Sequence, residues 1–181
     1  SFETEEPATS IEILGSLAFV GTAGAGVRII SVETVSEPRE LGDFGASDGL
    51  SIAATTIHNN LLYVLSHDPP ALFAVDISDP SAPKILSEIE DIDVFDTPRD
   101  LAVNHPYLYV VDQVTQLQVI DISSPTDLTT IPNDTDDEFF PNSIQIHNKK
   151  AFVTDEDSGL LVFDLISPTA PQFITSLKLP D

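Results

Sequence analysis

The chain has 181 residues, of which 30 are Asp or Glu and 7 are Lys or Arg, so its formal net charge at pH 7 is -23. A surface of this charge repels the phosphates of nucleic acids and anionic lipids, which excludes both as partners, because their binding depends on basic patches. The absence of cysteine excludes disulfides and thiol chemistry. No stretch approaches the roughly 18 consecutive apolar residues that indicate a membrane-spanning helix, so we expect no membrane insertion.

One sequence phrase recurs along the chain, first in a divergent form and then in three clear copies. The four copies occupy residues 27–32, 72–80, 117–125 and 160–168. They align on Ser31, Asp76, Asp121 and Asp164. The spacings between these positions are 45, 45 and 43 residues, and a fixed period of this length is typical of a repeat architecture.

Each phrase belongs to a longer unit. Twelve or thirteen residues before the aligned position, an aromatic residue precedes a valine, at Phe19, Tyr63, Tyr109 and Phe152. A short turn and another apolar stretch come before this pair, and a further apolar segment follows the phrase. The sequence therefore predicts one domain over residues 1–181, with four repeats of about 44 residues at roughly 10–53, 54–98, 99–141 and 142–181.

The apolar segments of each repeat have the length and composition of β-strands. They run four to seven residues, are rich in Val, Ile, Leu, Phe and Tyr, and are bounded by Gly, Asn, Asp, Ser and Pro. The third segment is apolar on both faces, because the neighbours Val119 and Ile120 must point in opposite directions. A strand covered on both faces needs a sheet against each of them. These features predict an all-β fold, a β-propeller built of four-stranded antiparallel blades.

The chain begins and stops at the same point of the repeat cycle. Residues 1–9 resemble the last strand of a repeat, and so does the segment that starts at Ser176. We expect either a segment of a longer repeat array or a processed chain. A four-bladed ring completed by the N-terminal segment, and a partner chain that supplies further blades, are the alternatives.

The stretch Leu-Gln-Val-Ile-Asp-Ile-Ser-Ser-Pro at residues 117–125 follows Tyr109, Val110 and a short acidic loop. In this order the residues resemble the LVIVD repeat of bacterial and archaeal surface proteins, and the resemblance covers four repeats. It implies a propeller in an extracellular or cell-surface location, and it brings no catalytic motif. The first repeat departs most from the pattern, because Ser31 stands where the other repeats have Asp.

Several acidic residues are candidates for a structural or a metal-binding role. The recurrent Asp76, Asp121 and Asp164 lead into Ser-x-Pro or similar turns, and we interpret them as Asx-turn residues. Asp155 and Asp157 precede Gly159 in a loop that could wrap Ca²⁺. The alternative is a tight turn in which Asp155 caps backbone N–H groups and Gly159 has a positive φ. A second possible calcium site lies at Asp134, Asp136 and Glu138, in a run that a solvated loop would also explain.

A propeller commonly binds ligands at the end where the blade-to-blade links and the second hairpins meet. There the sequence predicts Arg99, Asp100, Asn142 and Ser143, with Asp112 and Asp155 behind them. Arg99 would bind a carboxylate ligand, or pair with Asp100 or a neighbouring Asp, which is the alternative that we favour. His58, His105 and His147 fall in separate first hairpin turns, and we expect them to be turn residues rather than a zinc site.

Three classes of function follow from these observations. The first is a non-catalytic interaction or structural module, with a protein partner or self-assembly. The second is a propeller that binds Ca²⁺ or a small ligand, and the third is a metal-dependent hydrolase, for which too few acids, Asn and His converge. We expect the first, and no enzyme. The acidic surface suits solubility in the salty surroundings of a halophilic or marine organism.

Overall fold

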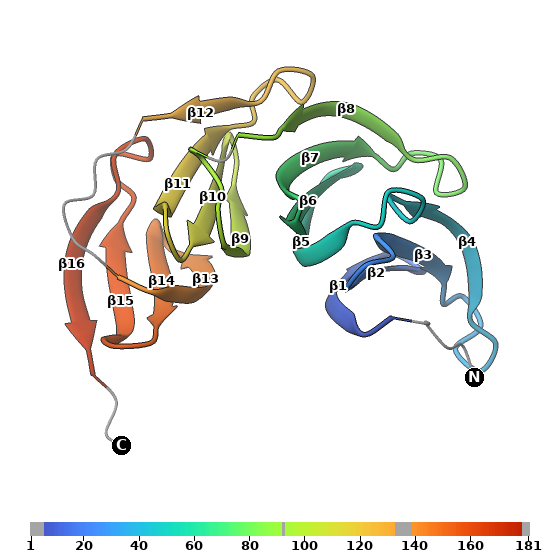
Figure 1. Cartoon of the computed structure of the whole chain (residues 1–181), viewed down its shortest axis with the longest axis horizontal. Coiled ribbons are helices and arrows are strands. Elements are labelled where there is room, and N and C mark those ends of the chain that lie inside the picture. The colour runs from blue at the N-terminus through green and yellow to red at the C-terminus, as the bar shows by residue number, and fades with distance from the viewer. Residues whose placement is uncertain (1–5, 92, 133–138, 179–181) are drawn as a thin grey trace. The chain divides into compact units, whose positions relative to one another are not determined.

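The computed structural model describes residues 6–91, 93–132 and 139–178. Within them the chain forms sixteen β-strands in four antiparallel sheets, and no helix (Figure 1). In every sheet each strand pairs with the next along the chain, and we call the four sheets blades 1 to 4. Blade 1 contains β1 (Ala8–Leu14), β2 (Leu17–Thr22), β3 (Val27–Ser31) and β4 (Arg39–Phe44). Blade 2 contains β5 (Ser51–His58), β6 (Leu61–Asp68), β7 (Pro70–Asp76) and β8 (Lys84–Ile89).

Blade 3 contains β9 (Pro98–Asn104), β10 (Tyr107–Asp112), β11 (Gln116–Asp121) and the short β12 (Thr129–Ile131). Blade 4 contains β13 (Pro141–His147), β14 (Lys150–Asp155), β15 (Gly159–Asp164) and β16 (Gln172–Leu177). The chain divides into two compact units, one up to Glu90 with blades 1 and 2, and one from Asp91 with blades 3 and 4. The predicted four repeats of four antiparallel strands are therefore confirmed.

The first strand of each blade begins slightly before the predicted repeat boundary. In blade 1, Ala8 and Thr9 belong to β1, although the sequence placed residues 1–9 with the last strand of a repeat; Ser1 to Glu5 lie outside the described residues. A register shift interrupts the start of β1, and similar shifts occur where β5, β9 and β13 begin. A bulge of this kind breaks the alternation of apolar and polar residues, which is why the sequence pattern starts later than the strand.

The core of each unit lies between the facing sides of its two blades. We call the side of a blade that packs on the following blade, or the equivalent side of blade 4, its trailing face. The opposite side is its leading face. In the first unit, Phe19, Val27 and Ile29 form the trailing face of blade 1 and belong to one buried cluster with the leading face of blade 2. That leading face contributes Leu62, Val64, Phe73 and Val75.

The second unit repeats this arrangement. The trailing face of blade 3 contributes Tyr109, Leu117 and Val119, and it packs in one buried cluster with Ile144, Val153 and Leu161 of blade 4. Every one of these six side chains is at least nine-tenths buried. Because burial of a large apolar side chain contributes about 2 kcal/mol, the junction between blades contributes strongly to the stability of each unit.

One buried hydroxyl also crosses the junction in the second unit. The Tyr109 hydroxyl donates a hydrogen bond of 2.9 Å to the carbonyl of Pro168, in the link between β15 and β16. Burial raises the pKa of Tyr109 to about 12. The equivalent Tyr63 in blade 2 is also buried, and its hydroxyl has no hydrogen-bond partner among the described residues.

These two tyrosines form a matched pair for mutagenesis. Tyr109→Phe leaves the Pro168 carbonyl without its donor, and we expect it to lower the free energy of unfolding by about 1–2 kcal/mol. Tyr63→Phe removes a hydroxyl that gains nothing from burial, so we expect no loss of stability. Urea unfolding of both variants checks the difference, and equal losses would contradict it.

Candidate functional site

A polar residue is buried at one equivalent position in all four blades. It comes three residues after the aromatic residue of the second strand, as Thr22, Ser66, Asp112 and Asp155. In blade 1 the Thr22 hydroxyl donates to the Gly26 carbonyl at 2.8 Å. In blade 2 the Ser66 hydroxyl donates to the Ser51 carbonyl at 3.2 Å. The aspartates of blades 3 and 4 each accept several backbone hydrogen bonds.

Asp112 is fully buried and accepts four backbone hydrogen bonds. Its Oδ2 accepts from the N–H groups of Asp96 and Thr97, which precede β9, at 2.9 Å each. Its Oδ1 accepts from Val114 and Thr115, in the β10–β11 hairpin, at 2.7 and 2.9 Å. The carboxylate therefore fastens the segment that leads into blade 3 to the second hairpin of that blade. Asp112 was a candidate ligand-binding residue, but the structure leaves it no surface for a ligand.

Asp155 has the same role in blade 4. Its Oδ1 accepts from the N–H groups of Asp157 and Ser158 at 3.1 and 2.6 Å, and its Oδ2 accepts from Phe140, which precedes β13. Gly159 closes the loop with a φ of 79°. This is the capped turn that the sequence analysis gave as the alternative to calcium binding.

The metal candidates do not gather in the part of the chain that the structure describes. There, no group of three or more His, Asp or Glu side chains is placed to hold a metal ion. Asp134, Asp136 and Glu138 lie outside the described residues, so the structure does not bear on them. A calcium site in that run therefore stays a prediction.

Chelation tests both calcium predictions together. We expect EDTA to leave the melting temperature of the protein unchanged, because the Asp155 carboxylate binds backbone N–H groups and a solvated loop explains the run at Asp134, Asp136 and Glu138. Differential scanning calorimetry with EDTA, and then with added Ca²⁺ or Mg²⁺, measures this. A melting temperature that falls with EDTA and recovers with Ca²⁺ alone would contradict our expectation.

Asp100 and Ser143 do come together, as the sequence predicted for this end of the blades. The Asp100 Oδ2 accepts from the Ser143 hydroxyl at 2.6 Å and from the Ile144 N–H at 2.9 Å, which joins β9 to β13. Its Oδ1 accepts from the Leu101 N–H at 2.8 Å. In the first unit, a 3.0 Å hydrogen bond between Ser10 and Thr55 joins β1 to β5 in a similar way. These bonds hold neighbouring blades together.

Among the residues that the structure describes, Arg99 pairs with no aspartate, so the favoured prediction of such a pair finds no support there. Its guanidinium donates to the side-chain carbonyl of Gln113 instead. The Gln113 amide in turn donates to Glu156 at 3.0 Å and reaches Asn142 at 3.5 Å. The Asp100 carboxylate already binds Ser143 and Ile144, which explains why Arg99 binds the Gln113 side chain. The result is a hydrogen-bonding surface of exposed Arg99, Asn142 and Glu156 around Gln113.

Sequence reasoning missed Gln113 and Glu156, which complete this surface. Both are the first residue after an aspartate that ends the second strand of its blade, at Asp112 and Asp155. Their equivalent place in the repeat could have indicated that they lie at the same end. Nothing in the sequence indicates that the two side chains meet.

The recurrent aspartates form the Asx turns that the sequence indicated. The carboxylates of Asp76, Asp121 and Asp164 each accept a hydrogen bond from the backbone N–H two residues ahead, at 2.8–2.9 Å. Hydrogen bonds from the hydroxyls of Ser78 and Ser123, and then from their N–H groups, hold the pKa values of Asp76 and Asp121 below the ordinary 3.8.

These lowered pKa values predict a pH dependence of stability. Because the folded-state pKa is below the unfolded-state value, the contribution of each carboxylate is complete above about pH 4 and is lost as the pH falls through the folded-state pKa. The variant Ser78→Ala/Ser123→Ala removes the largest cause of both shifts. We expect the difference in unfolding free energy between wild type and variant to shrink on acidification from about pH 5 to about pH 2. A constant difference across urea titrations in this range would refute the assignment.

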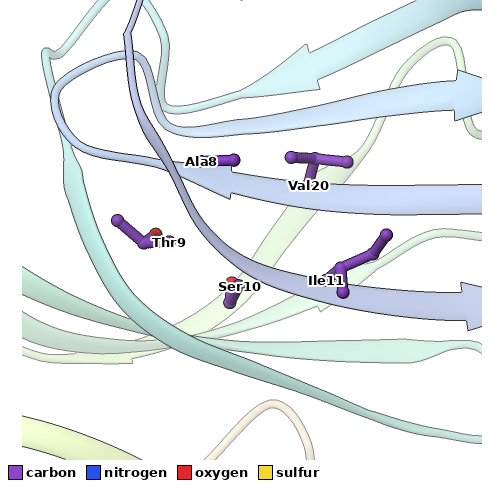
Figure 2. Close-up of a pocket in the computed structure, with 5 residues that line it drawn as sticks. All are labelled: Ala8, Thr9, Ser10, Ile11 and Val20. Carbon is purple, nitrogen blue, oxygen red and sulfur yellow. The ribbon is translucent and has the colours of Figure 1, made fainter.

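Large apolar side chains are exposed on strands of blades 1 and 4. Ile11 and Ile13 of β1 are 64% and 57% exposed, and β16 exposes Phe173, Ile174 and Leu177. A surface hollow of about 410 Å³ lies beside Ile11, lined by Ala8, Thr9, Ser10, Ile11 and Val20 (Figure 2). Sequence reasoning missed these exposed residues, because an apolar residue in a strand is expected to be buried, and the sequence does not show which blades leave that position exposed.

The structure has no helix in its described residues that could cross a lipid bilayer. Comparison with known families gave one match, to a model described as the LVIVD repeat, over residues 59–91, 97–133 and 142–178. These ranges cover blades 3 and 4, blade 2 without its first strand β5, and more than half of the chain. They leave out blade 1, whose sequence departs most from the repeat. A search of curated proteins found no match.

Three solved structures show the same fold at low identity. A functionally unknown protein from Desulfotomaculum acetoxidans DSM 771 has a TM-score of 0.75 and 12% identity over 97% of this chain and 57% of its own. The computationally designed Ika8 protein has a TM-score of 0.71 and 11% identity, over 96% and 53%. The Neurospora crassa Pan2 WD40 domain has a TM-score of 0.70 and 13% identity, over 95% and 50%. The chain thus spans about half the length of each, and its fold is a β-propeller of four-stranded blades.

Proposed function

Because the chain belongs to the LVIVD repeat family, we propose that it is a non-catalytic interaction or structural module of an extracellular or cell-surface protein. The observation that carries the proposal is the exposure of large apolar side chains on β1 and β16. Large apolar side chains that stay exposed on a strand are characteristic of protein interaction sites. The acidic surface keeps such a protein soluble and disfavours nucleic acids as competing partners.

The commitment of the buried carboxylates supports a role other than catalysis. A general acid or base must reach the substrate within hydrogen-bond distance, directly or through one water. The carboxylate oxygens of Asp112 and Asp155 accept hydrogen bonds from backbone N–H groups. Those of Asp100 accept from Leu101, Ser143 and Ile144. These carboxylates stabilise the ends of the blades.

The surface around Gln113 favours a second candidate function, the binding of a small polar ligand. Arg99 and Asn142 are exposed there and would donate hydrogen bonds to a carboxylate. A thermal-shift screen of small carboxylates tests this idea, with Arg99→Ala as the control. A ligand that stabilises the wild type and not the variant would support it, and no stabilisation by any compound would count against it.

Cross-linking on intact cells tests the main proposal. A membrane-impermeant amine-reactive cross-linker is added to cells that make the protein, and linked peptides are identified by mass spectrometry. We expect links from Lys149, Lys150 or Lys178, which are accessible, to a lysine of another polypeptide chain. A protein that the reagent does not reach in intact cells would overturn the proposed location. A protein that is labelled but never linked to another chain would overturn the proposed interaction.

A further inference from the structure

The leading face of blade 1 is partly exposed: Ile11 and Ile13 are exposed, whereas Ala18 and Ile30 of the same face are buried. Ile11 on its leading face is 64% exposed, whereas the residues at the same position of blades 2 and 4, Thr55 and Ile144, are 7% and 0% exposed. Val20 of β2 pairs with Ile11 and is partly exposed, while the equivalent Val64 is fully buried. Ile11 and Val20 of this face help to line the hollow of about 410 Å³ at the start of β1 (Figure 2). The same face also carries an ion pair between Arg28 and Glu40.

Blade 4 exposes the complementary face. Its trailing face consists of Phe152, Leu160 and Val162, which are partly exposed, and Leu177, which is 59% exposed. The residues at the first three of these positions in blade 1 (Phe19, Val27 and Ile29) and in blade 3 (Tyr109, Leu117 and Val119) are almost completely buried. They are buried because a following blade packs on them.

We propose that the leading face of blade 1 docks on the trailing face of blade 4 in a second copy of this chain. The two faces are the two halves of a junction that the chain already builds twice, between blades 1 and 2 and between blades 3 and 4. A second copy therefore supplies a trailing face for the exposed leading face of blade 1, and a leading face for the exposed trailing face of blade 4. This inference rests on the proposed function and names the partner.

The link between the third and fourth strands of a blade belongs to this junction. In the second unit, the link of blade 4 accepts the hydrogen bond from Tyr109 at the Pro168 carbonyl. In the first unit, the link of blade 2 lies against Gly42 of blade 1. A Cβ at Gly42 would be 2.7 Å from the Pro80 carbonyl oxygen. In blade 1 the corresponding link exposes Val35, together with Glu33 and Glu37.

Charge at this end of the junction favours the same pairing. Lys149 and Lys150 lie at the first hairpin of blade 4, where the equivalent Leu17 and Tyr107 of blades 1 and 3 pack on the following blade. They are two of the seven Lys and Arg residues of the chain. Opposite a second copy they would meet the acidic link with Glu33 and Glu37.

Light scattering of the 181-residue chain tests the proposal. We expect a mass of twice the 19.5 kDa of one chain at micromolar concentration, and tighter association in high salt, which screens the repulsion between two chains of charge -23. Ile11→Gln/Ile13→Gln should raise the dissociation constant of each junction about 100-fold, because two apolar side chains per junction are no longer buried. Ile85→Gln/Val114→Gln is the matched control, since both side chains are exposed outside the two faces. We expect it to have no effect.

A mixing experiment distinguishes this head-to-tail contact from a symmetric one. The Ile11→Gln/Ile13→Gln chain keeps an intact trailing face, and a Leu177→Gln chain keeps an intact leading face. Their mixture should associate more tightly than either variant alone, because one junction then pairs two intact faces. Urea unfolding of each variant verifies that its fold is intact, as expected for substitutions of exposed residues.

Two outcomes would overturn the inference. One is a mass of a single chain at all concentrations and salt conditions, and the other is a dimer that the Ile11 and Ile13 substitutions leave unchanged. Either result would leave the proposed function standing if cross-linking on cells still joins the protein to a different polypeptide. The absence of any cross-link would instead remove the proposed function itself.

Discussion

Asp112→Ala will lower the free energy of unfolding by about 4 kcal/mol, because it removes the acceptor of four backbone hydrogen bonds in a buried site. The N–H groups of Asp96, Thr97, Val114 and Thr115 then lose their partner together. We expect the segment before β9 and the β10–β11 hairpin to separate locally. Urea unfolding gives the loss of stability, and hydrogen exchange of these four amides gives its location.

Two further variants show whether the carboxylate itself is responsible. Asp157→Ala changes an exposed residue of the corresponding loop of blade 4, and we expect a change within about 0.5 kcal/mol. Asp112→Thr introduces the residue type that blade 1 has at this position, and its hydroxyl should recover part of the loss. A loss for Asp112→Ala no larger than that for Asp157→Ala would show that the four hydrogen bonds do not stabilise the blade.

Gly26→Ala will destabilise the first unit by about 4 kcal/mol or more. Gly26 has a φ of +63°, and a Cβ there would overlap the carbonyl oxygen of Phe44 and lie 2.7 Å from the Gly45 carbonyl carbon. The neighbouring atoms belong to the backbone, so they cannot rotate away as a side chain would. The loop between β2 and β3 would therefore have to separate from the end of β4.

Gly15→Ala is the matched control for this substitution. Gly15 has nearly the same φ, +61°, but a Cβ there has nothing within 4 Å. Its loss of stability should be limited to the conformational cost of a left-handed residue, about 1 kcal/mol. Thermal unfolding of the two variants measures the difference. Equal losses would mean that the close approach of backbone at Gly26 has no energetic consequence.

The repeat pattern predicted the strands and the Asx turns because both depend on local sequence. Val119 and Ile120 alternate across a strand, and Asp121 binds the N–H of Ser123, which is two residues away. Such features recur in every copy, so each copy supports the others. The number of blades followed in the same way from the spacing of Ser31, Asp76, Asp121 and Asp164.

The candidate site was less predictable, because its contacts join residues that are far apart in the sequence. The sequence brought Asp100 and Ser143 to the same end of the blades but could not show that Asp100 binds Ser143 rather than Arg99. The sequence predicted Asp112 as a candidate ligand-binding residue, and its burial depends on the segment before β9 folding over it. Ile11 reads as core, and its exposure depends on which blade lies beside it.

Hydroxyl-radical footprinting of the native protein on cells tests most directly whether the exposed strand faces of blades 1 and 4 are the interaction surface. The reference is the purified chain at high dilution. We predict that oxidation of Ile11, Ile13 and Leu177 falls on the cell, while that of the exposed Ile85 and Val114 is unchanged. Equal oxidation of all five residues in both samples would contradict the account, and so would protection confined to the surface around Arg99 and Asn142.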